Sequence, residues 1–161
     1  MVNLYLGDCL EVMKQIPDGS VDAIICDLPY GTTACKWDSV IPFEPLWEQY
    51  KRIIKHNGAI VLTASQPFTS ALITSNINWF KYCWYWEKSR PTGHLNAKKM
   101  PMKNIEEIVI FYKKQCLYNA QMQVGKPNHV SDGHVRKTVP TNNCYGKFKN
   151  VPQKQTNLKY P

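Results

Sequence analysis

Three strand-sized apolar runs, each followed by a helix-sized segment, constrain the fold of this 161-residue chain more than any other feature. We expect strands at 3–6, 23–26 and 59–62, and helices between Asp8 and Pro17, over 44–55 and over 69–74. An alternation of strands and helices is the pattern of a parallel α/β sheet, and the chain is long enough to bury one core. The sequence therefore predicts a single, mostly parallel α/β domain.

Two later strands are expected to differ from the first three. Residues 80–86 alternate aromatic and other side chains, residues 105–112 form a second apolar run, and the loop 88–103 between them has no helical pattern. Strands joined without a crossover helix can pair antiparallel, so we predict an antiparallel pair at the sheet edge. The loop is basic, which suits contact with phosphates, although a solvated hairpin connection explains it equally well.

The tetrapeptide Asp27-Leu28-Pro29-Tyr30 follows the second apolar run directly and is followed by Gly31. In open α/β sheets ligands bind at the carboxyl ends of strands, which makes this turn a candidate site. The simpler interpretation is a strand that stops, with Asp, Pro and Gly forming its turn. Asp8 follows the first expected strand in the same way, and alone it would be read as a helix cap. Parallel strands would bring both carboxylates to one edge of the sheet.

The net charge of +8 is confined to the last third of the chain. Residues 113–161 hold nine Lys and Arg against one acidic residue, whereas the charges of residues 1–112 cancel. Tyr118, Tyr145 and Phe148 are interleaved with these basic residues. Basic groups bind phosphates and aromatic rings stack on bases, so a nucleic-acid-binding segment is predicted on a neutral scaffold. A solvated basic tail, or a segment that orders only on a partner, is the alternative.

The six cysteines contain no C-x-x-C pair, so reduced thiols of a cytosolic protein are expected instead of disulfides or a metal site. No apolar run approaches the length of a membrane span, and the N-terminus shows no secretory signal.

These residues resemble those of a family, the DNA amino-methyltransferases, whose catalytic motif is D/S/N-P-P-Y/F. Asp27 to Tyr30 is similar to its D-L-P-Y variant, which is typical of phage-type adenine methyltransferases. The resemblance extends to Gly7-Asp8, to DLPYGTTACKWD over residues 27–38, to residues 58–68 and to residues 84–88. The catalytic motif near the N-terminus is similar to the β-class order of motifs. The resemblance implies a bacterial or phage-encoded enzyme of the restriction–modification kind, with a Rossmann-like methyltransferase sheet.

The resemblance implies S-adenosylmethionine-dependent methylation of the exocyclic N6 amine of adenine in double-stranded DNA. The amine is a poor nucleophile, and two acceptors for its N–H groups, the Asp27 carboxylate and the Leu28 carbonyl, would localise its lone pair. Pro29 restricts the conformation of Leu28, and Tyr30 offers a ring face to a base taken out of the duplex. Asp8 and Asp27 are the expected cofactor contacts. The expected DNA contacts are Lys36, Lys88, Arg90, Lys98, Lys99, Arg136, Lys137, Lys147 and Lys149.

The chain departs from the family pattern at the cofactor. The family holds S-adenosylmethionine with an F-x-G-x-G turn, but here no two glycines lie within seven positions of each other. A second departure is Ile105 before Glu106, where relatives often carry histidine. We therefore expect an incomplete sheet and cofactor pocket, whose glycine-rich turn lies outside this sequence, is supplied by a second chain or copy, or has been lost. Residues 1–112 would be the catalytic part and 113–161 the target-recognition segment. An N4-cytosine methyltransferase and a non-catalytic DNA-binding remnant remain the alternatives.

Overall fold

A computed structural model describes residues 2–125 and 158–159 of the chain. The chain divides into two compact units, Met1–Leu117 and Tyr118–Pro161. The first unit holds the sheet and helices.

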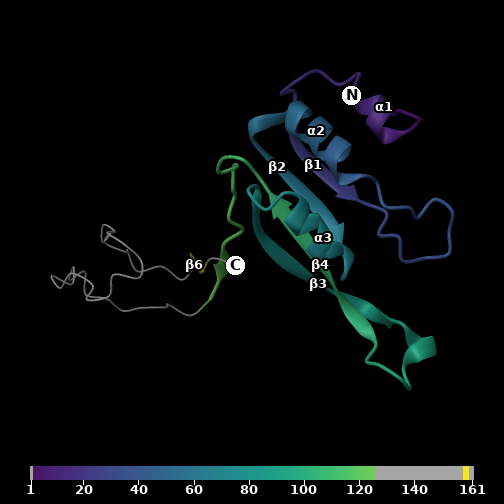
Figure 1. Cartoon of the computed structure of the whole chain (residues 1–161). Coiled ribbons are helices and arrows are strands. Elements are labelled where there is room, and N and C mark those ends of the chain that lie inside the picture. Colours follow the sequence, from purple (N-terminus) through teal and green to yellow (C-terminus); the bar gives the residue numbers. More distant parts are fainter. Residues whose placement is uncertain (1, 126–157, 160–161) are drawn as a thin grey trace, which may run out of the picture. The chain divides into compact units, whose positions relative to one another are not determined.

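Eight elements make up the first unit. In chain order they are α1 (Cys9–Met13), β1 (Val21–Asp27), α2 (Phe43–Ile53), β2 (Ile54–Ala64), α3 (Phe68–Ser75), β3 (Phe80–Thr92), the 3-10 helix η1 (His94–Asn96) and β4 (Lys103–Phe111). The sheet order is β1-β2-β4-β3, with β1 parallel to β2 and β4 antiparallel to both its neighbours (Figure 1). Three strands therefore run in one direction and β4 runs against them. The second unit contributes one short antiparallel ladder between β5 (Gln123–Val124) and β6 (Leu158–Lys159).

The predicted α/β class is confirmed, and so is the antiparallel edge pair, which is β3 with β4. Residues 3–6 do not form the expected strand, and Leu4 and Leu6 are almost fully exposed. A strand needs a neighbour for its backbone hydrogen bonds. Among the described residues no segment pairs with the outer edge of β1, so residues 3–6 have no ladder to join.

Several element boundaries differ from the prediction: the first helix ends already at Met13, and three further differences change the sheet. The second expected helix ends at Ile53, and the strand expected over residues 59–62 begins already at Ile54, because buried Ile54 pairs with Val21 of β1. The third difference is in the hairpin: β3 continues to Thr92, opposite Lys103, and shortens the predicted loop 88–103. The basic residues before Thr92 therefore lie on a strand.

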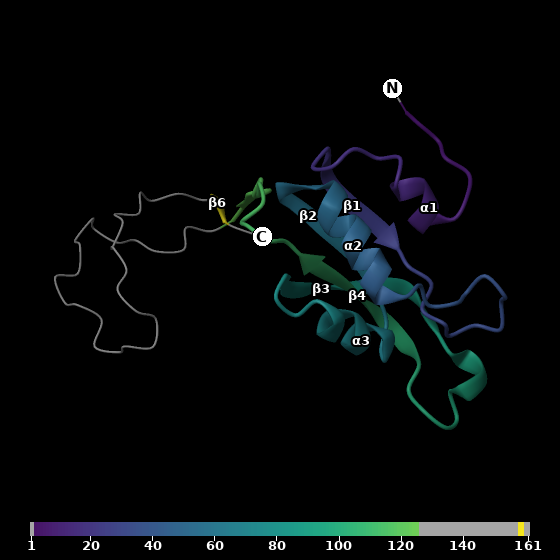
Figure 2. The ribbon, with the colours of Figure 1, turned by 45° about the horizontal axis from the view of Figure 1, so that its top comes forward.

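Helices α2 and α3 lie on the same face of the sheet (Figure 2). The side chains of Leu62, Val109 and Phe111 are fully buried beneath them. Trp47 of α2 packs on Phe111 with ring centroids 4.8 Å apart, and its Nε1 donates a 2.7 Å hydrogen bond to Ser75 Oγ of α3. These contacts fix the helical layer against the strands that end at the candidate site. In the described part of the chain, every helix is too short or too polar to cross a membrane.

Candidate functional site

Asp27 ends β1 directly beside Thr63 of β2, because the parallel register pairs these two residues. The Thr63 hydroxyl donates to Asp27 Oδ1, and the Tyr30 hydroxyl lies 2.9 Å from the same oxygen and 2.8 Å from Thr63 Oγ1. All the hydrogen bonds that the described residues make to this carboxylate use Oδ1. The Asp27 side chain is exposed, so Oδ2 is open to an incoming donor.

The rest of the tetrapeptide is anchored in the protein. The Leu28 side chain is buried in the core, and the Tyr30 ring stacks on Phe68 at a centroid distance of 5.2 Å. Burial raises the pKa of Tyr30, and the nearby carboxylates of Asp27 and Glu106 raise it further. Tyr30 is therefore a neutral hydrogen-bonding group at physiological pH. One of its ring faces is occupied by Phe68, which leaves a single face for another aromatic group.

Asp38 holds the loop that follows the tetrapeptide. Its buried carboxylate accepts hydrogen bonds from the backbone N–H groups of Gly31, Thr32 and Thr33 at 2.9, 2.9 and 2.6 Å. The Thr33 hydroxyl and these N–H groups lower the pKa of Asp38 to about 2. Gly31 adopts a φ of +68°, in the left-handed region that favours glycine. The chain is thereby turned back within one residue of Tyr30.

Asp8 does not share a contact with Asp27. Its Oδ1 accepts a 2.8 Å hydrogen bond from Leu10 N and caps α1, as the simpler interpretation of this residue expected. Burial raises the pKa of the following residue, Cys9, and the negative charges of Asp8 and of the Cys26 thiolate would raise it further. The Asp8 carboxylate therefore caps α1, and one of its oxygens is occupied by that hydrogen bond.

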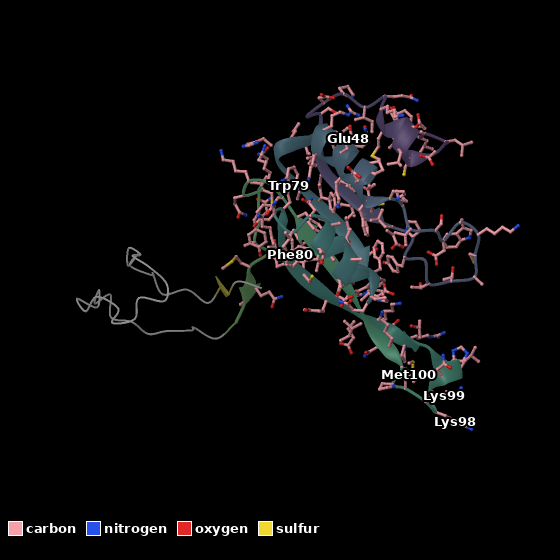
Figure 3. The ribbon with its side chains drawn as sticks, in the orientation of Figure 1. Glu48, Trp79, Phe80, Lys98, Lys99 and Met100 are labelled. Carbon is pink, nitrogen blue, oxygen red and sulfur yellow. The ribbon has the colours of Figure 1, made fainter. Side chains whose placement is uncertain are left out.

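The basic residues predicted to contact DNA fall into three groups. Lys88 forms an ion pair with Glu106, and both side chains are mostly buried. Lys36 and Arg90 are exposed, and Lys98 and Lys99 are exposed at the far end of the β3–β4 hairpin (Figure 3). The remaining four lie outside the described residues: Arg136, Lys137, Lys147 and Lys149.

Three residues at the site were not among the predicted site residues. Thr63 holds the Asp27 carboxylate, Phe68 supports the Tyr30 ring and Asp38 holds the loop. The sequence could have indicated Thr63, because Thr63 directly follows the expected strand 59–62, the neighbour of the strand that ends at Asp27. No comparable sequence signal pointed to the contact between Phe68 and Tyr30. Among the described residues, no cluster of three or more His, Cys, Asp or Glu side chains is arranged to hold a metal ion.

Comparison with known proteins places this geometry in a known fold. No family model matches the chain. Among solved structures, the M1.HpyAVI–SAM complex is 22% identical with a TM-score of 0.55, over 81% of this chain and 64% of that one. The cytosine-N4-specific PvuII DNA methyltransferase is 14% identical with a TM-score of 0.52, over 74% and 51%. TTHA0409 of Thermus thermophilus, assigned as a DNA modification methylase, is 17% identical with a TM-score of 0.50, over 71% and 54%.

These TM-scores show a shared fold. The chain spans between 51% and 64% of the length of the three structures. Over most of its own length, the chain therefore has the α/β fold found in DNA methyltransferases.

Proposed function

We propose that this chain supplies the acceptor-base half of a DNA amino-methyltransferase that modifies the N6 amine of adenine with S-adenosylmethionine as methyl donor. The observation that carries the proposal is the Asp27 carboxylate, which stands exposed at the end of β1 with one oxygen fixed by Thr63 and the other open. The D-L-P-Y motif and the fold shared with DNA methyltransferases support the same assignment.

In this function the chain prepares the amine for attack on a methyl group. Asp27 Oδ2 accepts one N–H of the exocyclic amine, and the carbonyl of Leu28 accepts the other. The lone pair then points away from the ring system of the base. Because Oδ1 is held by Thr63 and Tyr30, the carboxylate does not have to reorient during the reaction. The chain contributes by positioning and by electrostatics, with no covalent intermediate on the protein.

Tyr30 would receive the target base, which has to leave the duplex because its amine cannot be reached inside the stack. The ring face opposite Phe68 is the one on which a base would stack. Stacking of a base on an aromatic side chain contributes about 1–3 kcal/mol. Tyr30 therefore serves both the base, through its ring, and Asp27, through its hydroxyl.

The described residues fit the amine better than they fit the methyl donor. S-adenosylmethionine would bring an electrophilic methyl group, and in the family resemblance a glycine-rich turn with free backbone N–H groups would hold it. The sequence has no closely spaced glycine pair to form such a turn, and the Asp8 carboxylate caps α1. We expect the isolated chain to bind S-adenosylmethionine weakly.

Contact with DNA is assigned to the exposed basic residues. Lys36, Arg90, Lys98 and Lys99 are available for phosphates, and residues 113–161 are proposed as the target-recognition segment. Lys88 is already paired with Glu106, so it would reach a phosphate only if that pair opened. The reduced thiols expected from the cysteine pattern suit a bacterial or phage-encoded protein of the cytoplasm.

Methylation of cytosine N4 is the second candidate. The acceptor pair would serve that amine equally well, and the fold is shared with the cytosine-N4-specific PvuII enzyme. Asp instead of Ser at the first motif position favours adenine in the family resemblance. The third candidate is a non-catalytic DNA-binding protein, which the use of Asp8 as a helix cap would permit.

The test is transfer of a tritiated methyl group to DNA by the full chain, alone and mixed with a polypeptide that carries a glycine-rich turn, followed by identification of the modified base. Asp27→Asn preserves shape but removes the carboxylate, and we expect it to lower transfer by at least about 100-fold while DNA binding is retained. The matched control is Asp22→Asn, in the same strand, where the carboxylate pairs with Lys55 on the surface. Transfer that survives Asp27→Asn would refute the catalytic assignment, and modified cytosine would favour the second candidate.

A further inference from the structure

Two half-exposed tryptophans follow each other on one face of β3. Trp84 and Trp86 are two residues apart, so their side chains lie on the same face of the strand, and Tyr85 between them lies on the other. Trp84 is 50% exposed and Trp86 is 51% exposed. Single exposed apolar residues are common on protein surfaces, whereas two neighbouring indoles form an apolar patch of the kind found at binding sites. We call Trp84 and Trp86 the indole pair.

The indole pair is held in place by the sheet. Trp84 is in register with Ile108 and Trp86 with Glu106, both in β4. The ring of Tyr82 packs beside Trp84, with the ring centroids 5.9 Å apart and the planes tilted by 42°. Residues two positions apart in a strand are separated by about 6.6–6.8 Å. This separation is about twice the 3.4 Å spacing of stacked bases, so it leaves room for a flat ring beside each indole.

The charges around the indole pair favour a negatively charged ligand. Glu106, opposite Trp86, forms an ion pair with Lys88, so its negative charge is compensated. Residues 88–105, which include the end of β3 and the hairpin, contain five basic residues and no acidic one. Arg90 is exposed in this segment, and the hairpin extends beyond the rest of the sheet (Figure 1). The two indoles are therefore followed along the chain by a positively charged surface.

A nucleic-acid strand combines flat rings with negative charge, and the exposed indoles select its unpaired form. In a duplex, both faces of a base are covered by its stacked neighbours, so an indole cannot stack on it. In an unpaired strand these faces are accessible to aromatic side chains. Stacked aromatic rings beside a positively charged path for the phosphates are the usual means by which proteins hold single strands. The indole pair and the basic hairpin supply both parts.

The indole pair lies in line with the candidate site. Asp27, Thr63, Ile108 and Trp84 are in register across β1, β2, β4 and β3. Neighbouring strands are about 4.8 Å apart, so three steps across the sheet place Trp84 about 14 Å from Asp27. This distance corresponds to about four nucleotides at the 3.4 Å spacing of a duplex, and to fewer in an extended strand. One strand can therefore reach both places.

We propose that Trp84 and Trp86 bind single-stranded DNA by stacking on its bases, while Arg90 and the lysines of the hairpin contact its phosphates. The protein thereby holds the target strand apart from its complement, a few nucleotides away from the base that is to be modified. Binding of the strand stands on the rings and charges of β3. Only the position of the target base at Asp27 rests on the proposed function.

The first experiment measures binding of the full chain to three labelled probes by fluorescence anisotropy: a thymidine decamer, an abasic strand of the same length and a duplex of the same length. Trp84→Leu and Trp86→Leu should each weaken binding of the decamer by about 5–150-fold, and should leave the abasic strand and the duplex within about 2-fold. The matched control is Tyr85→Leu, since Tyr85 is 71% exposed on the other face of β3. Unchanged affinity for the decamer, equal losses for the abasic strand, or an equal loss in Tyr85→Leu would overturn the proposal.

The second experiment uses the unsubstituted chain, so it does not depend on how the variants fold. In nuclear magnetic resonance spectra, the indole N–H signals of Trp84 and Trp86 should move when the decamer is added, while the signal of buried Trp47 stays in place. Signals that move with protein concentration instead would mean that a second copy covers the indole pair. Signals that move only with a proline-rich peptide would mean that a protein partner does, and either result overturns the proposal.

Neither experiment uses S-adenosylmethionine or methyl transfer. A chain that binds the decamer through the indole pair but methylates no DNA would therefore refute the proposed function and leave the binding site intact. Methyl transfer that persists in both Trp84→Leu and Trp86→Leu with unchanged affinity for the decamer would refute the indole pair alone.

Discussion

Replacement of Arg52 tests how α1 is attached to the rest of the fold. The guanidinium donates to the backbone carbonyls of Met13 and Ile16, at the end of α1 and just after it, at 2.7 and 2.8 Å, and to the carboxylate of Asp18. A hydrogen bond from a charged donor contributes about 1.5–3 kcal/mol. Because the Arg52 side chain is 26% exposed, water can partly replace it at the two carbonyls. We therefore expect Arg52→Ala to lower the free energy of unfolding by about 2–4 kcal/mol.

The assay is thermal and urea unfolding of the full chain followed by circular dichroism. For a chain of this size about 1 kcal/mol corresponds to roughly 3 °C, so the melting temperature should fall by roughly 6–12 °C. Amide exchange should become faster in α1 before the rest of the sheet, since the lost contacts are local. Arg52→Lys retains the charge but cannot reach both carbonyls, and it should recover less than half of the loss.

The decisive control is Asp18→Ala, which removes the ion pair and leaves the carbonyl contacts in place. The Asp18 side chain is 78% exposed, so its loss should cost about 0–1 kcal/mol. If Asp18→Ala destabilised the chain as much as Arg52→Ala, or if 1 M salt abolished the effect of Arg52→Ala, the stabilisation would come from the ion pair. The carbonyl argument would then be wrong.

Three further predictions concern the loop and the hairpin. The lowered pKa of Asp38 means that its carboxylate stabilises the fold fully above about pH 4, and that this contribution is lost as the pH falls through about 2. The free energy of unfolding of Asp38→Asn should therefore be lower than that of the wild type at neutral pH, and the two values should converge near pH 2. Gly31→Ala should lower the free energy of unfolding by about 1–2 kcal/mol because of the positive φ, and by a further steric amount because the new Cβ would lie 3.0 Å from a side-chain carbon. Gly19→Ala, where φ is +58° and nothing lies within 4 Å, should show only the loss from the positive φ. Urea unfolding of the two variants measures both losses. Equal losses for both variants would contradict the steric term. Replacing Lys98 and Lys99 by alanine should reduce the slope of log affinity for duplex DNA against log salt by up to about 2, measured by fluorescence anisotropy, and an unchanged slope would exclude the hairpin tip from the interface.

The sequence was informative where one local pattern decides the outcome. The apolar run before Asp27 is a strand because alternate residues pack on the helical layer, and the segment around Leu46 and Tyr50 is a helix because its apolar residues share one face. The same reasoning placed the tetrapeptide at a strand end. It also identified the antiparallel edge pair, since no helical pattern separates the two strands.

The sequence was less informative where a distant partner decides the outcome. Residues 3–6 have strand composition, but a strand forms only beside a neighbour. Among the described residues no segment pairs with the outer edge of β1. Ile54 belongs to β2 and not to the predicted helix, because it pairs with Val21, which is far away in the sequence. The role of Thr63 at the site likewise follows from the register between two strands. Such pairings are set by the whole sheet and have no signature in a short window.

The position of β4 in the sheet has a consequence for synthesis on the ribosome. β4 is the last strand of the first unit to be made, yet it lies in the interior, between β2 and β3. After residue 64 has left the ribosome, the edge of β2 that pairs with β4 stays unpaired until residue 111 has also emerged, which takes roughly 2–9 s at usual rates of elongation. A chain stopped before Lys103 would lack the strand that joins the β1–β2 pair to β3. The first unit is therefore expected to become cooperative, and the edges of β2 and β3 that face β4 to be protected from aggregation, only when β4 has emerged.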